Sequence, residues 1–489
     1  RVYQGWDKPK QFDRNLVVIG AGSGGLVSAY IAAAVKADVS LIEKHAMGGD
    51  CLNTGCVPSK ALIRSARLAA EVRKAPELGF SHADAQVDFA AVMERVQRVI
   101  KQIEPHDSVE RYTGLGVDVI TGEARITSPW HVEVNGRSIS TRNIIIAAGA
   151  RPFVPDLPGL KDMPIVTSDT VWNLREQPRR LLVLGGGPIG CELALAFQQL
   201  GSQVIQVERG ARLLPREDAD ASELVMGSLR SAGVDLRLRH QAETFELRDG
   251  VPAVRCRSLD DDSTVDIEFD CVLVALGRVA NTSGYGIETL DLTLRDNGTL
   301  ETNEYLATRF PNVFAVGDVT GPYQFTHAAS HQAWYAAVNA LFGTFRRFKA
   351  DYRVLPHCTF TDPEVARVGL SETEAQAQSI DYEVTRYGID DLDRAIADET
   401  AEGFVKVLTV PGRDRILGVT IVGAHAGELI AEYVLAMKYN LGLNKILGTV
   451  HSYPTLSEAN KYAAGEWKRA HQPERLLQWV ARFHAWRRG

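Results

Sequence analysis

Two cysteines separated by four residues, Cys51 and Cys56, are the side chains of this 489-residue sequence best suited to redox chemistry. A disulfide closing so short a loop would stabilise the fold by only about 2–3 kcal/mol, so stabilisation is a poor reason for the pair. Gly55 permits a tight turn, and Pro58 suits the first turn of a helix. A cysteine at a helix N-terminus has a stabilised thiolate. The spacing therefore predicts a redox-active dithiol.

A dinucleotide-binding pattern precedes the dithiol. An apolar run at 16–19 leads into a glycine-rich turn and an alanine-rich helical stretch. In such units one glycine makes the turn, a second admits the pyrophosphate, and a third lets the helix pack on the strand. Glu43 ends the next apolar run, where its carboxylate can accept hydrogen bonds from ribose hydroxyls. The glycines in these three roles are Gly20, Gly22 and Gly25.

The same unit recurs later in the chain, so two bound dinucleotides are expected. The apolar strand 203–207 ends at Glu208, whose charge repels a 2′-phosphate and favours NAD(H) over NADP(H). Arg209 and Arg212 follow closely, and either a phosphate contact or a solvated loop would explain them. The glycines of this second turn are Gly185, Gly187 and Gly190.

Three further strands end in residues that could contact a cofactor. Gly149 and Gly277 follow strands at 143–148 and 271–276, and Asp318 follows a strand at 313–316. An acid at a strand end can hold a cofactor hydroxyl. After about residue 351 the pattern becomes α+β and carries no nucleotide signal.

The predicted fold class is α/β, with two Rossmann-like dinucleotide-binding domains and a C-terminal α+β dimerisation domain. Four segments are expected: the first part of an FAD-binding domain, an NAD(P)H-binding domain, the second part of the FAD-binding domain, and an interface domain. Their predicted bounds are 1–155, 156–280, 281–350 and 351–489.

Composition limits the kinds of binding partner and the cellular compartment that we expect for this protein. The net charge of −7 is mild and dispersed, which argues against nucleic acid, and six scattered cysteines favour a reducing cytoplasm over secretion. No apolar run reaches the roughly eighteen residues of a membrane span. Because the sequence begins at Arg1, an upstream segment could still tether the protein at the inner membrane.

The C-terminal tail predicts an amphipathic helix. Apolar residues at 476, 479, 480, 483 and 486 share one helical face, which has a basic end. Packing on the body of a dimer is the favoured explanation, and docking at a membrane or a partner protein is the alternative.

In this order, the motifs resemble the class I flavin-dependent pyridine nucleotide-disulfide oxidoreductases, which include dihydrolipoyl dehydrogenase, glutathione reductase and mercuric reductase. The resemblance spans nearly the whole chain and extends to His-Ser-Tyr-Pro-Thr-Leu-Ser-Glu at 451–458. It implies a homodimer with FAD on the first domain and NAD(P)H on the second. Cys56 resembles the charge-transfer thiol and Cys51 the interchange thiol. Lys60 would lie near the reactive edge of the flavin ring, with Glu192 as its ion-pair partner.

The sequence departs from the disulfide reductases at Tyr453. In those enzymes a histidine at this position, oriented by the residue matching Glu458, deprotonates the partner subunit's interchange thiol. Tyrosine titrates near 10 and is a much poorer base than imidazole at neutral pH. Mercuric reductases resemble this chain in carrying tyrosine here, yet they also carry a C-terminal cysteine pair, whereas Cys358 is the last cysteine of this chain. His451 could replace the missing base or could be a packed surface histidine.

These residues favour an enzyme that passes electrons from NADH through flavin to a disulfide or a thiophilic metal ion, in the manner of mercuric reductase. No resident metal site is predicted. The first alternative is a dihydrolipoyl dehydrogenase variant that oxidises a lipoyl carrier. The second is a redox sensor or binding module whose flavin is structural.

Overall fold

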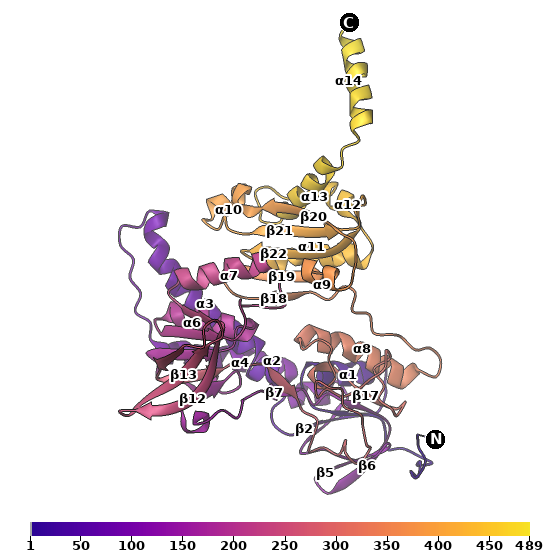
Figure 1. Cartoon of the computed structure of the whole chain (residues 1–489). Helices are drawn as coiled ribbons and strands as arrows, with labels where there is room; N and C mark the ends of the chain where they lie inside the picture. Colours follow the sequence, from indigo (N-terminus) through magenta and orange to yellow (C-terminus); the bar gives the residue numbers. More distant parts are fainter. Residues whose placement is uncertain (1) are drawn as a thin grey trace. The chain divides into compact units, whose positions relative to one another are not determined.

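The computed structural model describes residues 2–489 (Figure 1). The chain forms two compact units. Unit 1 comprises the chain up to Ala211 together with Ala232–Asp351, and unit 2 comprises Arg212–Ser231 and Tyr352–Gly489.

The first sheet of unit 1 contains the predicted first nucleotide-binding pattern. Its parallel strands are β1 (Arg14–Ile19), β2 (Val39–Glu43), β3 (Asp118–Thr121), β6 (Arg137–Ile146) and β17 (Val313–Ala315). Antiparallel strands β4 (Arg125–Ser128) and β5 (His131–Val134) complete the order β3-β2-β1-β6-β5-β4, with β17 paired to β6. The apolar run 16–19 is at most 5% exposed, as expected for a strand covered on both faces.

The second sheet of unit 1 repeats this arrangement around the second glycine turn. Its five strands are all parallel, in the order β11 (Asp235–Leu238), β10 (Gln203–Glu208), β9 (Arg180–Leu184), β15 (Cys271–Val274) and β8 (Ile165–Thr167). An antiparallel sheet of β12 (His240–Arg248), β13 (Val251–Ser258) and β14 (Thr264–Glu268) is inserted before β15. The short pair β7 (Ala150–Pro152) and β16 (Arg278–Ala280) follows the strands that end near Gly149 and Gly277.

A helix follows each glycine turn, and two further helices contain the cysteines of the predicted dithiol, Cys51 and Cys56. The helices of unit 1 are α1 (Ser23–Ala34), α2 (Gly49–Asn53), α3 (Cys56–Lys74), α4 (Phe89–Ile103), α5 (Val109–Gly114), α6 (Pro188–Leu200) and α8 (Thr326–Phe342). Helix α3 packs against α4 and α6, and α1 packs against α8. Short 3-10 turns lie at Ala75–Leu78, Glu104–Asp107, Leu160–Asp162, Val171–Asn173 and Gly317–Val319.

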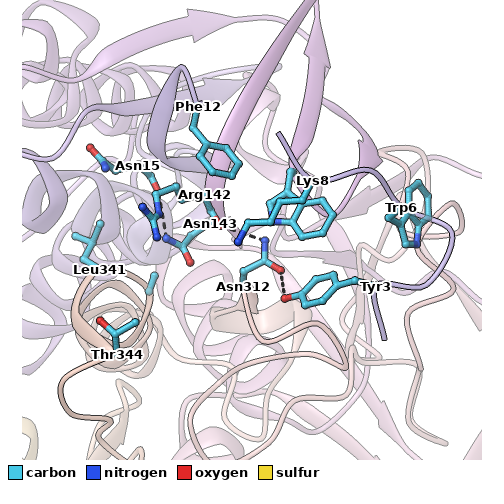
Figure 2. A pocket seen from close by; sticks show the side chains of 12 residues that line it. Tyr3, Trp6, Lys8, Phe12, Asn15, Arg142, Asn143, Asn312, Leu341 and Thr344 are labelled. Atoms are coloured by element: carbon cyan, nitrogen blue, oxygen red, sulfur yellow. Dashed lines mark hydrogen bonds between the residues drawn. The ribbon is translucent and has the colours of Figure 1, made fainter. Parts of the chain in front are cut away.

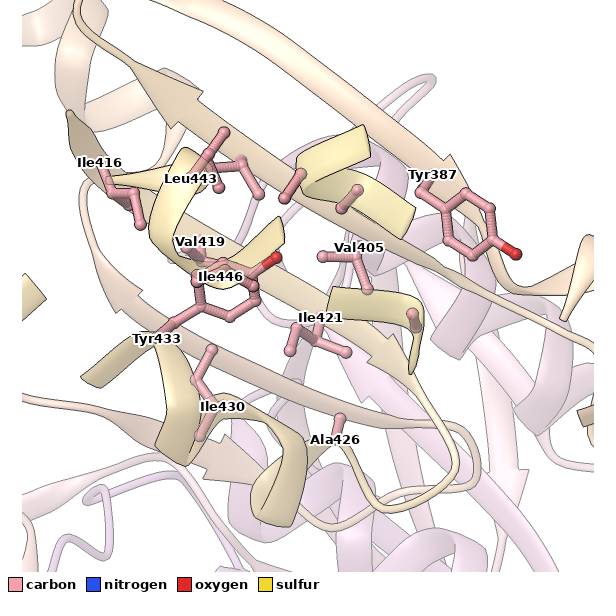
Figure 3. Packing of buried hydrophobic residues seen from close by; sticks show 14 of the residues in the cluster. Tyr387, Val405, Ile416, Val419, Ile421, Ala426, Ile430, Tyr433, Leu443 and Ile446 are labelled. Carbon is pink, nitrogen blue, oxygen red and sulfur yellow. The ribbon is translucent and has the colours of Figure 1, made fainter. Parts of the chain in front are cut away.

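Unit 2 is an antiparallel sheet covered by helices. Its strands run in the order β18 (His357–Thr359), β19 (Glu364–Gly369), β22 (Ile416–Gly423), β21 (Phe404–Thr409) and β20 (Glu383–Gly388). Its helices are α7 (Ala219–Ser231), α9 (Glu372–Ala377), α10 (Asp393–Ala397), α11 (Ala426–Lys438), α12 (Leu443–Leu447), α13 (Glu458–Ala470) and α14 (Glu474–Arg488), with a 3-10 turn at Ile389–Asp391. Tyr433 of α11 is fully buried in the core of this unit, which also contains Val405 and Ile421 from the sheet (Figure 3).

Helix α7 joins unit 2 although it lies between β10 and β11 in the sequence. The buried ammonium of Lys406 on β21 lies 2.9 Å from carboxylate oxygens of Asp218, Asp220 and Glu372. These ion pairs bind the start of α7 to the C-terminal sheet. Residues 212–231, which the sequence prediction assigned to the NAD(P)H-binding segment, therefore cluster with the C-terminal unit.

The tail forms the predicted helix, α14, which buries none of its residues. Among residues 2–489, no helix combines the length and apolar character needed to cross a membrane.

Candidate active site

The two cysteines lie on consecutive short elements of unit 1. Cys51 lies within α2, and Cys56 is the first residue of α3. Gly55 makes the connection, and a Cβ added there would lie 2.9 Å from the carbonyl oxygen of Asp50. Cys56 is exposed and Cys51 is partly buried, and both thiols are free. The helix dipole of α3 therefore acts directly on Cys56, as the sequence predicts.

The two thiols differ in acidity. A hydrogen bond from Cys51 lowers the pKa of Cys56 to about 6, although partial desolvation by neighbouring atoms acts in the opposite direction, and Thr326 and Lys60 lower it further. The Thr326 hydroxyl oxygen lies 3.4 Å from the Cys56 sulfur. The same hydrogen bond, together with burial, raises the pKa of Cys51. In the reduced pair, a negative charge is therefore more favourable on Cys56 than on Cys51.

Lys60 and Glu192 form an ion pair close to the dithiol. The Lys60 Nζ lies 2.8 Å from Oε2 of Glu192, whose side chain is 8% exposed. Lys60 is one turn beyond Cys56 on α3, and Glu192 is in the second turn of α6. The pair therefore joins the dithiol helix to the helix of the second nucleotide-binding unit.

The first glycine turn fits a dinucleotide. A Cβ on Gly20 would lie 2.3 Å from the Ala147 carbonyl oxygen, and one on Gly25 would lie 1.7 Å from that of Gly20, so both positions require glycine. Gly22 caps α1 without any side-chain hydrogen bond, so the backbone N–H groups of the first turn are available to a pyrophosphate. Glu43 accepts hydrogen bonds from the Ala21 and His45 amides at 2.7 and 2.8 Å, which fixes its carboxylate beside this turn.

The second turn has the same construction. Cβ atoms on Gly185 and Gly190 would lie 2.2 and 2.3 Å from the carbonyl oxygens of Ala275 and Gly185, and Gly187 caps α6 without a side-chain hydrogen bond. Glu208 accepts hydrogen bonds from the Gly186 and Gly210 amides, both at 2.6 Å. The residues present therefore fit a dinucleotide at each turn.

Asp318 provides a polar group at the end of β17. Burial raises its pKa to about 6, although the charge of Arg278 opposes this shift. A carboxylate in such a position is suited to accept hydrogen bonds from hydroxyl groups of a cofactor. Gly149 and Gly277 have φ values of +68° and +112°, so each occupies a backbone conformation that favours glycine.

Arg278 contacts several segments around the dithiol, although it was not among the residues predicted for the site. Its guanidinium pairs with Asp50, donates to Ser168 Oγ at 3.1 Å and to the Ala150 carbonyl at 3.0 Å, and lies 3.4 Å from Asp169. It thereby ties α2, which carries Cys51, to the β7–β16 pair. Its position directly after Gly277 at a strand end was the available signal. Thr326, at the start of α8, was also missed.

The predicted C-terminal residues lie together in unit 2. The exposed Tyr453 hydroxyl donates a hydrogen bond to Asp393 Oδ2 at 2.9 Å, and this bond raises the pKa of the phenol. Buried Glu458 accepts hydrogen bonds from the Thr455 amide at 3.1 Å and the Tyr462 hydroxyl at 3.2 Å.

The second candidate base, His451, is only 7% exposed in its side chain. Its Nδ1 lies 3.1 Å from the Thr449 carbonyl oxygen, and its Nε2 lies 2.8 Å from Glu432 Oε1. Both ring nitrogens therefore have partners within unit 2.

A separate cavity of about 610 Å³ lies between the N-terminal segment and the first sheet of unit 1 (Figure 2). None of the predicted site residues lines it. Tyr3 stacks on Trp130 with ring centroids 4.7 Å apart and donates a hydrogen bond to Asn312 Oδ1 at 2.8 Å. The Asn312 amide nitrogen in turn donates to the carbonyls of Pro129 and Arg142. The polar groups of Asn312 are thus used within the fold.

Comparison with known proteins agrees with this architecture. The chain is 35% identical to dihydrolipoyl dehydrogenase from Chlamydia muridarum, with 90% of this chain and 94% of that protein covered. It is 31% identical to mercuric reductase from Staphylococcus aureus, over 92% of this chain and 82% of that one. It is 33% identical to glutathione reductase from Burkholderia cepacia, over 92% and 98%.

A solved structure with the same fold is the Cu(II) complex of the HOCl-induced flavoprotein disulfide reductase RclA from Escherichia coli. Its TM-score is 0.82 at 26% identity, with 93% of this chain and 99% of that chain covered. Residues 14–333 match the pyridine nucleotide-disulphide oxidoreductase family, and residues 355–464 match the dimerisation domain of the same family, which supports a homodimer. The chain therefore belongs to the FAD-dependent pyridine nucleotide-disulphide oxidoreductases and is an oxidoreductase of that family.

Proposed function

We propose that this enzyme uses NADH to reduce a Cys51–Cys56 disulfide and delivers the electrons to a thiophilic metal ion, as a mercuric reductase does. The observation that carries this proposal is the hydrogen bond from Tyr453 to Asp393, which raises the pKa of the phenol and makes its proton harder to remove. When bound, FAD would supply the capacity to accept a hydride from NADH and to pass two electrons to a disulfide.

The cysteines have complementary roles in this reaction. Reduction breaks the S–S bond, consumes two electrons and one proton, and leaves a thiolate on Cys56 and a thiol on Cys51, in keeping with their pKa values. The Lys60 ammonium, held by Glu192, stabilises negative charge next to Cys56. Exposure alone would favour Cys56 as the thiol that meets the acceptor, so the assignment of that role to Cys51 depends on the acidity difference and on the family resemblance.

The raised pKa of Cys51 discriminates between classes of acceptor. To attack a disulfide, Cys51 must first lose its proton to a base, and a protonated tyrosine cannot accept it. A soft metal ion displaces the thiol proton itself when it binds sulfur, so this route needs no protein base. For mercury the balanced reaction is NADH + Hg(II) giving NAD⁺, H⁺ and Hg(0).

NADH is the preferred reductant in this proposal. The Glu208 carboxylate is held at the end of β10 by two backbone amides, where its charge opposes a 2′-phosphate. Arg212 donates to the carbonyls of Glu217 and Pro215, so its guanidinium serves its own loop. This contact favours the solvated-loop explanation over a phosphate contact for Arg212.

A dihydrolipoyl dehydrogenase variant is the second candidate. It is favoured by the 35% identity to enzymes of that name, the highest among the relatives named above. This function requires a lipoyl carrier whose thiols react although no histidine at position 453 is present to act as a base.

The test compares acceptors with the FAD-loaded enzyme. NADH oxidation is measured with Hg(II) plus excess thiol, with Cu(II), and with glutathione disulfide, and NAD⁺ reduction is measured with dihydrolipoamide. We expect the fastest turnover with a metal ion, its loss in Cys51→Ser, and a lower kcat/KM for NADPH than for NADH. Faster turnover with dihydrolipoamide would establish the second candidate instead.

A further inference from the structure

Helix α14 carries an apolar face that is exposed in the described part of the chain, residues 2–489. Leu476, Trp479, Phe483 and Trp486 share one side of the helix and are between 39% and 77% exposed. The ring centroids of Trp479 and Phe483 are 6.1 Å apart, as are those of Phe483 and Trp486, so the aromatic side chains form a continuous strip. The structure leaves these side chains exposed within the chain, and packing on the body of a dimer, which the sequence favoured, stays a prediction.

A short connection separates α14 from α13, the preceding helix of unit 2. His471 directly follows α13; its ring stacks on Trp467 with centroids 4.3 Å apart, and its Nε2 lies 2.9 Å from Glu383 Oε2. Gln472 and Pro473 then connect to α14 (Figure 1). The family's dimerisation domain matches only residues 355–464, so α14 lies beyond it.

The charge of α14 is opposite to that of the whole protein. The helix contains four arginines, Arg475, Arg482, Arg487 and Arg488, and a single acid, Glu474, within a chain of net charge −7. A protein with this overall charge is repelled by an anionic surface unless a basic segment makes the contact. Arginines beside a strip of tryptophan and phenylalanine are typical of helices that lie in the headgroup region of a bilayer.

We propose that α14 docks the enzyme on an anionic lipid surface, with the Trp479–Phe483–Trp486 strip in the interface and the arginines against lipid phosphates. The helix lies in the plane of the membrane and does not cross it. Both components are required, because the aromatic strip supplies apolar burial and the arginines supply attraction to the negative surface.

Vesicle flotation with the full FAD-loaded protein tests this proposal. We expect the protein to float with phosphatidylcholine vesicles that contain about one-third phosphatidylglycerol, and not with pure phosphatidylcholine. Binding should be lost in about 0.5 M NaCl, where charges are screened within a few ångströms. Arg482→Glu should weaken binding more than about fivefold, and the Trp479→Gln/Trp486→Gln variant about tenfold or more.

Two matched variants control for charge and exposed aromatic surface outside α14. Arg469→Glu reverses an exposed charge on α13, and Phe345→Gln removes a side chain that is 90% exposed. Both should bind vesicles like the unaltered protein, and all variants should retain the same NADH oxidation without vesicles. Failure of the unaltered protein to float with anionic vesicles would overturn the proposal. Equal flotation of the α14 variants would also overturn it, as would conversion of these variants to monomers, which would assign the strip to a second copy of the chain.

Discussion

The ammonium of Lys60 lies 2.8 Å from the carboxylate of Glu192, and this pair connects α3, which begins at Cys56, to α6, which follows the second glycine turn. Glu192 is buried whereas Lys60 is about one-third exposed, so most of the desolvation falls on the acid. The pair thus links the helix that begins at Cys56 to the helix that follows the second glycine turn.

A double-mutant cycle should show strong coupling between these two side chains. We expect Lys60→Met, Glu192→Gln and the double variant to give a coupling free energy of unfolding of about 1–2 kcal/mol, because each single change removes the ion pair and the carboxylate partner is largely buried. The exposed pair Lys161–Asp156 is the matched control, and its coupling should be much smaller because solvent screens both charges. Chemical denaturation of the four proteins of each cycle measures both values. Equal coupling in the two pairs would show that burial of Glu192 has no effect.

The rate at which Cys56 is alkylated should depend on pH as expected for a thiol with a low pKa. The reactive form is the thiolate, so the rate with iodoacetamide should rise between pH 5 and 7 with a midpoint near the pKa of about 6, and should level off above it. Cys51→Ala removes the hydrogen bond that contributes most to this low pKa, so its midpoint should move upward. Mass spectrometry of the reduced protein identifies the modified cysteine. A midpoint near 9 in the unaltered protein would contradict this assignment.

Flavin binding should weaken at acidic pH through Asp318. Hydroxyl donors of a cofactor favour the carboxylate form, and the pKa of Asp318 is raised to about 6 by burial. FAD affinity of the flavin-free protein should therefore be constant above pH 7 and fall as the pH drops below 6. Asp318→Asn should bind FAD about tenfold to a hundredfold more weakly at pH 8, with little pH dependence. Asp156→Asn, at an exposed position, is the control, and fluorescence titration measures each affinity.

Replacing Tyr453 with histidine should restore a base for dithiol chemistry. If removal of a thiol proton limits the reaction with dihydrolipoamide, Tyr453→His should raise the rate of NAD⁺ reduction by dihydrolipoamide about a hundredfold near pH 7.5. Tyr439→His, at another exposed tyrosine of unit 2, should leave this rate unchanged. Steady-state assays of the three proteins decide the matter. An unchanged rate in Tyr453→His would show that the missing imidazole does not limit the reaction.

The nucleotide-binding turns and the dithiol could be predicted because their signals are local. Each turn requires glycine where a strand, a turn and a helix meet within a few residues, and this requirement is visible in the chain itself. The helix start at Cys56 is similarly encoded by Gly55 and Pro58. The sheet orders and the helices at both turns accordingly agree with the predicted fold class.

The partners of the site residues could not be predicted in this way. Asp50 and Arg278 are 228 positions apart, and Tyr453 and Asp393 are 60 apart. The attachment of α7 to the C-terminal sheet likewise depends on Lys406, which is 186 positions from Asp220. No periodicity or spacing marks such pairs, because each forms only after separate elements have packed.

Local spacing was therefore sufficient to predict two dinucleotide-binding turns and a redox-active dithiol, since backbone conformation at a glycine turn is determined by its immediate neighbours. Folding in three dimensions decided that Thr326 lies beside the Cys56 thiol, which carboxylate accepts the hydrogen bond of the Tyr453 hydroxyl, and that the tail helix is left exposed. Those properties arise from burial and from contacts between distant segments, and both exist only in the packed molecule.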